Sequence, residues 1–278
     1  MQSIIIKPKH PVLQQYVQYF LFFKKQDATF LQYVTFPNNN LCLAIYKENH
    51  VQYEHQSVHN DCTITQGRKS FTSKLYGFHK KPFTVEISSM LDQVCIVFYP
   101  AALKAFTAEQ YNNLMALSKV EDIFSLKDHA LIERIFEEDA FPKRAAILED
   151  LLLQNLNDNI PATLKAALHV IETGQLDELS VDLLAKKLHV SVSSLFRLFT
   201  NYIGQSPKAY LKTVRFRQTL HELLHKQQRL THIAYDHQYY DQAHFINDFK
   251  AFAGYTPKQL VNKVSIQQDD LAWIYNKP

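Results

Sequence analysis

Residues 190–211 read VSVSSLFRLFTNYIGQSPKAYL, and this stretch decides the fold of the C-terminal part of the chain. Its apolar residues recur every three or four positions, which predicts a helix with one buried face. Ser191 stands before that helix as an N-cap, Gly204 supplies the turn after it, and Pro207 opens the next helix. The stretch therefore predicts two helices joined by a short turn.

The same pattern returns 50 residues later in the chain. Each copy is preceded by another short helical pattern, SVDLLAKKLHV from Ser180 and LTHIAYDHQYY from Leu230. The chain therefore contains a duplicated unit, which we interpret as two helix-turn-helix units. We call the second helix of each unit its reading helix. The matched positions are Leu195 and Phe245, Phe199 and Phe249, Gly204 and Gly254, Ser206 and Thr256, Pro207 and Pro257, and Lys208 and Lys258.

A long helix is predicted between the two units. Pro207 to Leu224 makes 18 residues, or about 27 Å at the rise of an α-helix. With the radii of the flanking helices added, this length can hold two reading helices about 34 Å apart, which is one turn of B-DNA. Helical repeats that bind proteins are the alternative, but such repeats stack without a long spacer.

The outward face of each reading helix carries side chains suited to contacts with DNA bases. Periodicity leaves Phe196 and Arg197 outward on the first helix and Ile246 at the equivalent position of the second. In a major groove an apolar side chain can pack on thymine methyl groups, while arginine binds O6 and N7 of guanine. The alternative is that Phe196 and Ile246 pack on the neighbouring long helix and that Arg197 is simply solvated.

The basic excess of the chain lies in this segment. Residues 160–263 hold 13 Lys and Arg against 8 Asp and Glu, while the net charge of the whole chain is +3. Two of the lysines fall in the first turn of a helix, where unpaired backbone N–H groups favour a phosphate. A solvated basic face is the ordinary alternative. The candidates for contacts with DNA phosphates are Lys208, Lys258, Lys212, Arg215 and Arg217.

Residues 162–263 as a whole closely resemble the DNA-binding domain of AraC-type transcription regulators. The resemblance rests on VSVSSLFRLFTNYIGQSPKAYLKTVRFRQTLHELL and on LTHIAYDHQYYDQAHFINDFKAFAGYTPKQL. It implies a domain of seven helices that places two helices in successive major grooves of an asymmetric site. By the motif of the family, the base-reading positions are Ser193, Phe196, Arg197, Gln242, Ala243, His244 and Asn247.

Two positions of the second unit depart from the pattern of the family. Gln238 stands where a turn glycine is usual, so a left-handed backbone there would cost about 1 kcal/mol. Asn247 stands where arginine is frequent, and acidic Asp248 follows it. The second reading helix is therefore expected either to read adenine through Asn247 or to hold its groove weakly.

The N-terminal part of the chain predicts β structure. Runs rich in Val, Ile, Phe, Tyr and Thr, such as LCLAIYK and QVCIVFYP, are separated by Pro, Asn and Gly up to about residue 100. TFPNNNLCLAIY and GFHKKPFTVEISSMLDQVCIVFYPAAL are similar to the β-rich sensor domain that precedes some regulators of this type, with FPNNN in place of a Pro-Asp-Gly turn. The aromatic residues Tyr19, Phe22, Tyr33, Phe36 and Tyr46 either line a cavity or form an ordinary core.

The expected fold class is α+β, with a β-rich sandwich or half-barrel, a helical connector and an all-α domain with two helix-turn-helix units. The expected boundaries are 1–120 for a sensor and dimerisation domain, 121–158 for the connector, 160–263 for the DNA-binding domain and 264–278 for a tail. The connector either pairs across a dimer or packs on the β domain. Its apolar residues Leu126, Leu131, Ile132, Ile135 and Phe136 suit both arrangements.

The sequence gives little support for an enzyme. Phosphate-binding glycine loops, Gly-x-Ser-x-Gly and Cys-x-x-Cys are all missing from it. The three cysteines, Cys42, Cys62 and Cys95, are expected to be reduced core thiols, and His79 an ordinary loop histidine rather than a metal ligand. A DNA-repair protein that transfers alkyl groups to a cysteine is the alternative function, because some such proteins carry a similar DNA-binding domain.

These features together predict a sequence-specific transcription regulator that binds double-stranded DNA. No apolar run approaches the length of a membrane span, and the N-terminus has no signal-peptide pattern, so we expect a cytoplasmic protein. We expect no cofactor, no metal and no catalytic residue. Further expected partners are a small-molecule effector, RNA polymerase and a second copy of the chain. Activation and repression are equally compatible with the sequence.

Overall fold

The computed structural model describes residues 2–55, 60–109, 111–116, 120–124, 130–174, 179–225, 229–237, 239–263, 266–268 and 271–276. Two residues used in the sequence predictions, Leu126 and Gln238, lie outside these ranges. The expectation of a strained turn at Gln238 is therefore not addressed by the structure.

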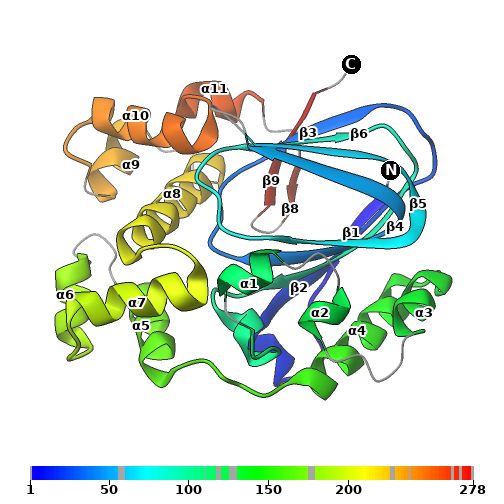
Figure 1. Cartoon of the computed structure of the whole chain (residues 1–278). Helices are drawn as coiled ribbons and strands as arrows, with labels where there is room; N and C mark the ends of the chain where they lie inside the picture. Colours follow the sequence, from blue (N-terminus) through cyan, green and yellow to red (C-terminus); the bar gives the residue numbers. More distant parts are fainter. Residues whose placement is uncertain are drawn as a thin grey trace.

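A curved sheet makes up the N-terminal part (Figure 1). The order of its strands is β1-β2-β7-β4-β5-β6-β3-β9-β8. The pairs are antiparallel except β5 with β6, which is parallel. The strands are β1 (Gln2–Ile6), β2 (Val17–Lys25), β3 (Leu31–Thr35), β4 (Leu41–His55), β5 (Asn60–Tyr76), β6 (Phe83–Ile87), β7 (Leu91–Phe98), β8 (Ile266–Gln268) and β9 (Leu271–Asn276). The expected half-barrel is confirmed.

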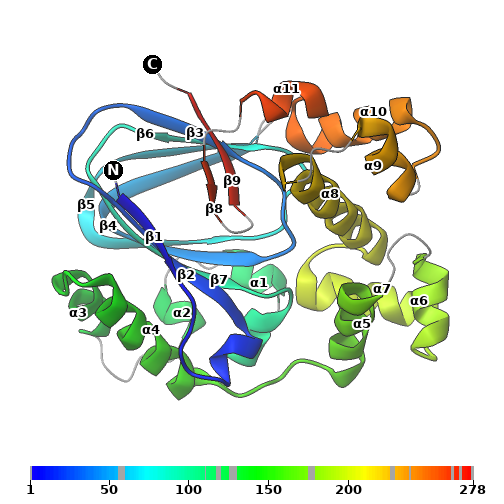
Figure 2. The same ribbon diagram turned by 180° about the vertical axis from the view of Figure 1, so that it is seen from behind.

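The last two strands come from the other end of the chain. β9 pairs with β3, with Tyr33 opposite Tyr275 and Val34 opposite Ile274. The segment expected as a C-terminal tail thus includes two strands that extend the N-terminal sheet beyond β3. The chain returns to the sheet after the helical part, as Figure 2 shows from behind.

The two faces of the sheet have separate cores because side chains alternate along a strand. Along β2, Phe20 and Phe22 belong to one core, whereas Tyr19, Leu21 and Phe23 belong to the other. The helices that follow β7 cover the first of these faces. They are α1 (Tyr111–Ala116), α2 (Val120–Ile123), α3 (Leu131–Glu137) and α4 (Phe141–Asn155), preceded by the 3-10 turns η1 (Leu13–Gln15) and η2 (Ala102–Ala105).

The burial of the connector side chains shows that they pack on the β domain. Leu131, Ile132, Ile135 and Phe136 are all buried in the core beneath the sheet. Phe141 of α4 stacks on Phe22 at 5.3 Å between ring centroids. These side chains therefore pack on the β domain within one chain, and they do not form an open surface for pairing with a second copy.

Seven helices follow in the described part of residues 162–263, the number that the resemblance implies. They are α5 (Ala162–Thr173), α6 (Val181–Lys187), α7 (Val192–Ile203), α8 (Pro207–His225), α9 (Leu230–Asp236), α10 (Gln242–Ala253) and α11 (Pro257–Val261). The long helix α8 has 19 residues, or about 28 Å. None of the helices in the described ranges is long and apolar enough to cross a lipid bilayer.

Each helix-turn-helix unit has its own core at one end of α8 (Figure 1). Leu184, Leu195 and Phe199 are buried in the core of the first unit. Ile233 and Phe245 are buried in that of the second, together with Phe216 of α8. The spacing of apolar residues in the sequence predicts most of these two cores, because most of their residues lie within one local unit.

The sheet and the helical domain are closely docked. Val34 and Phe36, at the end of β3, belong to the core of the second unit. Asn39 of the FPNNN segment is buried, accepts a hydrogen bond from Gln205 Nε2 at 3.0 Å and donates one to the carbonyl oxygen of Tyr210 at 3.3 Å. The segment that replaces the expected turn is therefore a contact between the two domains.

Candidate nucleic-acid interface and the adjoining pocket

The first reading helix is α7, and its start is fixed by Ser191. The hydroxyl of Ser191 accepts a hydrogen bond from the backbone N–H of Ser194 at 3.0 Å, as expected for an N-cap. Leu195 and Phe199 are fully buried beneath the helix. On the opposite face Ser193 and Arg197 are exposed, and the side chain of Phe196 is 50% exposed. About half of the surface of Phe196 is therefore open to solvent.

The second reading helix, α10, is built in the same way from different residues. Asp241 accepts a hydrogen bond from the backbone N–H of His244 at 2.7 Å. Its apolar stripe, Phe245, Phe249 and Phe252, is buried, and its exposed face carries Gln242, Ala243, His244 and Asn247. Ile246 differs from its counterpart Phe196, because it is half-buried and packs against the core of the second unit.

The exposed lysines lie at the starts of α8 and α11. Lys208 and Lys258 are both exposed, each directly after the proline that opens its helix. Thr256 and Gln259 form a capping box before Lys258, so the backbone of that turn is held in place. Lys212 forms an ion pair with Asp248 of α10, with 3.4 Å between Nζ and Oδ1.

Arg215 and Arg217 lie on α8 but face different surroundings. The guanidinium of Arg215 lies 5.7 Å from the ring centroid of Tyr239, which packs in the second unit. Arg217 is half-buried and lines a pocket that is otherwise formed by the β domain. The prediction that Arg217 contacts DNA phosphates used only the basic character of α8, and it stays a prediction.

Two exposed tyrosines beside α10 were not predicted as site residues. Tyr240 directly precedes the N-cap Asp241 and is 93% exposed, and Tyr235 on α9 is 84% exposed. An exposed tyrosine presents a hydroxyl that can donate or accept a hydrogen bond. The signal in the sequence is the pair of tyrosines in HQYYDQ, of which Tyr239 is buried and Tyr240 is not.

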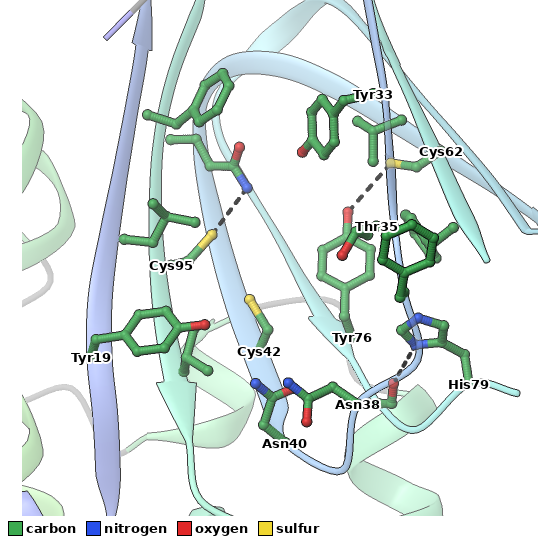
Figure 3. A pocket seen from close by; sticks show the side chains of 18 of the residues that line it. Tyr19, Tyr33, Thr35, Asn38, Asn40, Cys42, Cys62, Tyr76, His79 and Cys95 are labelled. Carbon is green, nitrogen blue, oxygen red and sulfur yellow. Dashed lines mark hydrogen bonds between the residues drawn. The ribbon is translucent and has the colours of Figure 1, made fainter. Parts of the chain in front are cut away.

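A pocket with a volume of about 150 Å³ is lined mainly by side chains of the sheet. Tyr19, Tyr33, Phe36 and Tyr46 line it, as one of the two interpretations of the sequence predicted. Phe22 does not, because it points to the opposite face of β2. Figure 3 shows Cys42, Cys62 and Cys95, from three different strands, along the same cavity.

Several polar groups in the wall of the pocket bind one another. The hydroxyls of Tyr46 and Tyr76 share a hydrogen bond at 2.8 Å, and Cys62 Sγ lies 3.5 Å from the Tyr76 hydroxyl. Burial raises the pKa of Cys62 to about 11. The pKa of the Cys95 thiol is also raised, first by its contact with Cys42 and then by burial. The thiols of Cys62 and Cys95 are therefore protonated at neutral pH and behave as small apolar groups.

His79 lies at the same pocket and is neutral. Its Nδ1–H donates to the carbonyl oxygen of Gly77 at 3.3 Å, and burial lowers its pKa to about 4. Among the described residues no group of three or more His, Cys, Asp or Glu side chains is arranged to hold a metal ion. The pocket is thus a largely apolar cavity with one charged side chain, Arg217, among the described residues that line it.

Comparison with known proteins gives separate matches for the helical part and for the sheet. A family model described as a helix-turn-helix domain matches residues 184–263. A family model described as a domain of unknown function, DUF6597, matches residues 6–117. The second match covers strands β2 to β7 and assigns them no function.

Two curated relatives are transcription regulators. The HTH-type transcriptional activator RhaS of Escherichia fergusonii is 23% identical over 180 residues, which is 64% of this chain and 63% of that protein. The uncharacterized HTH-type transcriptional regulator YtdP of Bacillus subtilis is 25% identical over 179 residues, covering 63% of this chain and 22% of that protein. The chain thus spans less than two thirds of the length of either relative.

Among solved structures, ToxT from Vibrio cholerae is 11% identical, with a TM-score of 0.45, over 87% of this chain and 97% of that chain. This likeness is too low to support an argument about function. The family assignment rests on the helical part, where the duplicated unit, the caps and the matched family model coincide. The C-terminal part of this chain, residues 184–263, is therefore a helix-turn-helix domain similar to those of AraC-type transcription regulators.

Proposed function

We propose that this protein is a sequence-specific DNA-binding transcription regulator in which α7 and α10 enter successive major grooves. One observation carries the proposal: the same face of both reading helices is exposed, although the opposite faces are fully packed. The two helices lie at opposite ends of α8, whose 19 residues give a spacer of about 28 Å. That length suits two grooves one helical turn apart.

The two reading helices offer different base contacts. On α7, Arg197 is suited to O6 and N7 of guanine, and Phe196 and Ser193 to a thymine methyl and a neighbouring base edge. On α10, Asn247 is suited to adenine. The remaining proposed base-reading residues of α10 are Gln242, Ala243 and His244.

The proposed phosphate contacts surround these helices. Lys208 and Lys258 place a positive charge in the first turn of a helix, where the helix dipole already favours an anion. Lys212 and Arg215 lie on α8 nearby, and the exposed hydroxyl of Tyr240 can donate to a phosphate oxygen beside α10. We leave Arg217 out of this set because it lines the pocket.

We propose that a small molecule bound in the N-terminal domain controls DNA binding. The pocket of about 150 Å³ is the candidate site, since ligand pockets are typically apolar cavities with few polar groups. A homodimer, contact with RNA polymerase and a location in the cytoplasm complete the proposal.

The state of two cysteine thiols speaks against the alternative function, an alkyl-transfer enzyme. Such a reaction needs a thiolate or a metal-bound thiol. The raised pKa values of Cys62 and Cys95 keep these thiols protonated. We therefore propose no catalytic role for the pocket.

Binding measurements with two variants test the regulator proposal. On a duplex selected from random DNA by the wild-type protein, Arg197→Ala is expected to weaken binding by about 1 to 3 kcal/mol and to relax the preference at one base pair. Lys208→Ala is expected to weaken binding to all duplexes alike and to lower the salt slope by about one. Equal losses from Arg197→Ala on every sequence would exclude its role in reading a base.

A further inference from the structure

A second pocket lies where β2 ends and β7 begins. Its volume of about 360 Å³ falls in the range of about 300 to 1,000 Å³ that is typical of ligand pockets. The described residues that line it belong to β2, β4, β5, β7, α3 and the segments beside them, and all of them lie between Lys24 and Asp139. Figures 1 and 2 both show α3 well away from α8. This second pocket is therefore separate from the pocket beside α8.

Asn49 brings a buried hydrogen-bond acceptor to the second pocket. Asn49 is 1% exposed, and its Nδ2 donates to Ser89 Oγ at 3.0 Å and to the carbonyl oxygen of Met90 at 2.9 Å. Since a carbonyl oxygen can only accept, the amide nitrogen must face Met90, which fixes the position of Oδ1. In the described part of the chain, Oδ1 is buried without a hydrogen-bond partner. A ligand with an N–H donor would remove the cost of leaving this acceptor unpaired.

An irregular backbone brings the neighbours of Asn49 to the same pocket. The register of β4 with β5 shifts between Lys47 and Asn49, and Glu48 has a φ of +55°. Gln66 Nε2 donates to the carbonyl oxygen of Glu48 at 3.0 Å and so holds this bulge. In a regular strand, successive side chains point to opposite faces. Here the three consecutive residues Lys47, Glu48 and Asn49 all line the pocket.

The charges at the second pocket leave one cation and one anion to a ligand. The paired groups are Lys24 with Asp139 at 3.4 Å, Lys25 with Asp27 at 2.9 Å, and Asp92 with Arg144 at 2.6 Å. Lys47 and Glu48 also line the pocket, and their side chains have no ion pair within the described ranges. Neighbouring charges of opposite sign suit a ligand that carries both signs, because a singly charged ligand would meet one attractive and one repulsive group.

The apolar part of the lining favours an apolar group on the ligand. It consists of Met90, Leu91 and Phe136. Met90 is 56% exposed, and its flexible thioether side chain can pack on apolar groups of irregular shape. A ligand that covers Met90 with an apolar group removes apolar surface from water, which is favourable.

From these observations we infer that the second pocket binds a free α-amino acid with an apolar side chain. The ammonium group donates to Asn49 Oδ1 and lies near Glu48. The carboxylate binds Lys47, and the apolar side chain packs on Met90. This inference goes beyond the proposed function, because it does not depend on whether α7 and α10 bind DNA.

Calorimetric titration of the full chain with L-leucine tests the inference, and two analogues separate the contributions of its charges. 4-Methylpentanoate lacks the ammonium group, and 3-methylbutylamine lacks the carboxylate. L-leucine is expected to bind at least about tenfold more tightly than either analogue, since a hydrogen bond that involves a charged group changes Kd by about tenfold or more.

Two variants locate the binding site. Lys47→Gln is expected to weaken the binding of L-leucine by about tenfold. Glu48→Gln, at a more exposed position, is expected to weaken it by about threefold. Asn49 is kept in these experiments, because its amide bonds to Ser89 and Met90 also hold the sheet together.

Lys69→Gln is the matched control. It removes the same charge from β5 near the bulge, but Lys69 is not among the described residues that line the second pocket. It is expected to leave the Kd for L-leucine unchanged. The inference is overturned if L-leucine does not bind at up to about 10 mM, if either analogue binds as tightly as L-leucine, if Lys47→Gln leaves the Kd unchanged, or if Lys69→Gln weakens binding as much as Lys47→Gln.

Discussion

The two helix-turn-helix units are copies of one sequence pattern, but they hold their reading helices differently. In the first unit Ser180 caps α6 through the backbone N–H of Leu183, whereas the N-cap of α9 in the second unit, Arg229, makes no side-chain cap. The first reading helix exposes Phe196 and Arg197, whereas the second half-buries Ile246. The comparison teaches that a repeat preserves the core and the turn while its outer face diverges.

The acidic residue of the second unit is part of the same divergence. Asp248 stands where the first unit has Leu198, and it pairs with Lys212 of α8. Lys212, a candidate for a contact with a DNA phosphate, is thereby already paired within the protein. We therefore expect the first unit to supply most of the sequence preference and the second to dock more weakly.

The turn glycines should give the largest difference between the two units. Gly204 and Gly254 both have a positive φ, +80° and +73°. A Cβ at Gly204 would lie 1.9 Å from the ring of Tyr111, whereas one at Gly254 would meet only Pro82 at 3.1 Å. Gly204→Ala is expected to lower the free energy of unfolding by about 2 to 4 kcal/mol, combining backbone strain with overpacking.

Gly254→Ala is the matched control and should lower the free energy of unfolding by about 1 to 2 kcal/mol from backbone strain. Urea unfolding followed by circular dichroism measures both. Equal losses in the two variants would mean that the contact of Tyr111 with the first turn is not tight.

Substitution of Ile246 should mainly change stability, whereas substitution of its counterpart Phe196 should mainly change DNA affinity. Ile246→Ala is expected to lower the free energy of unfolding by about 1 to 2 kcal/mol, less than for a fully buried isoleucine. Phe196→Ala should change stability by less than about 0.5 kcal/mol and weaken DNA binding instead, because its side chain is 50% exposed. Thermal unfolding and fluorescence anisotropy with selected DNA, measured on the same samples, check both. A stability loss from Phe196→Ala as large as that from Ile246→Ala would contradict the different packing of the two helices.

Removal of the ion pair between Asp248 and Lys212 should give the smallest of these changes. Asp248→Asn removes a charge that repels phosphates and releases Lys212, so DNA affinity is expected to rise by less than about 1 kcal/mol, as for other exposed pairs. The gain should shrink as salt is added. Weaker DNA binding in this variant would show that Asp248 instead holds α10 in a productive orientation.

Local chemistry made much of the helical domain predictable. The caps at Ser191 and Asp241, the turn glycines and the apolar stripes depend on residues within a few positions, and the structure has them as predicted. The half-barrel was predictable as a class from strand composition. The pairing of β9 with β3 was not, because it joins segments more than 200 residues apart without a local signal.

Residues that depend on docking were less predictable. Phe22 and Tyr19 lie on one strand but face different cores, and the face is set by the register of the sheet. Arg217 was assigned to DNA because α8 is basic, but the helix docks with that residue at the pocket. The three cysteines, far apart in sequence, converge on one cavity because β4, β5 and β7 are neighbours in the sheet.

Selection of bound fragments from random duplex DNA tests tandem readout most directly, when it is carried out with the wild-type protein, Arg197→Ala and Asn247→Ala. We expect an asymmetric motif of two blocks about one helical turn apart, in which each variant alters only its own block and Arg197→Ala reduces enrichment more. A single block, or the same block altered by both variants, would contradict the account.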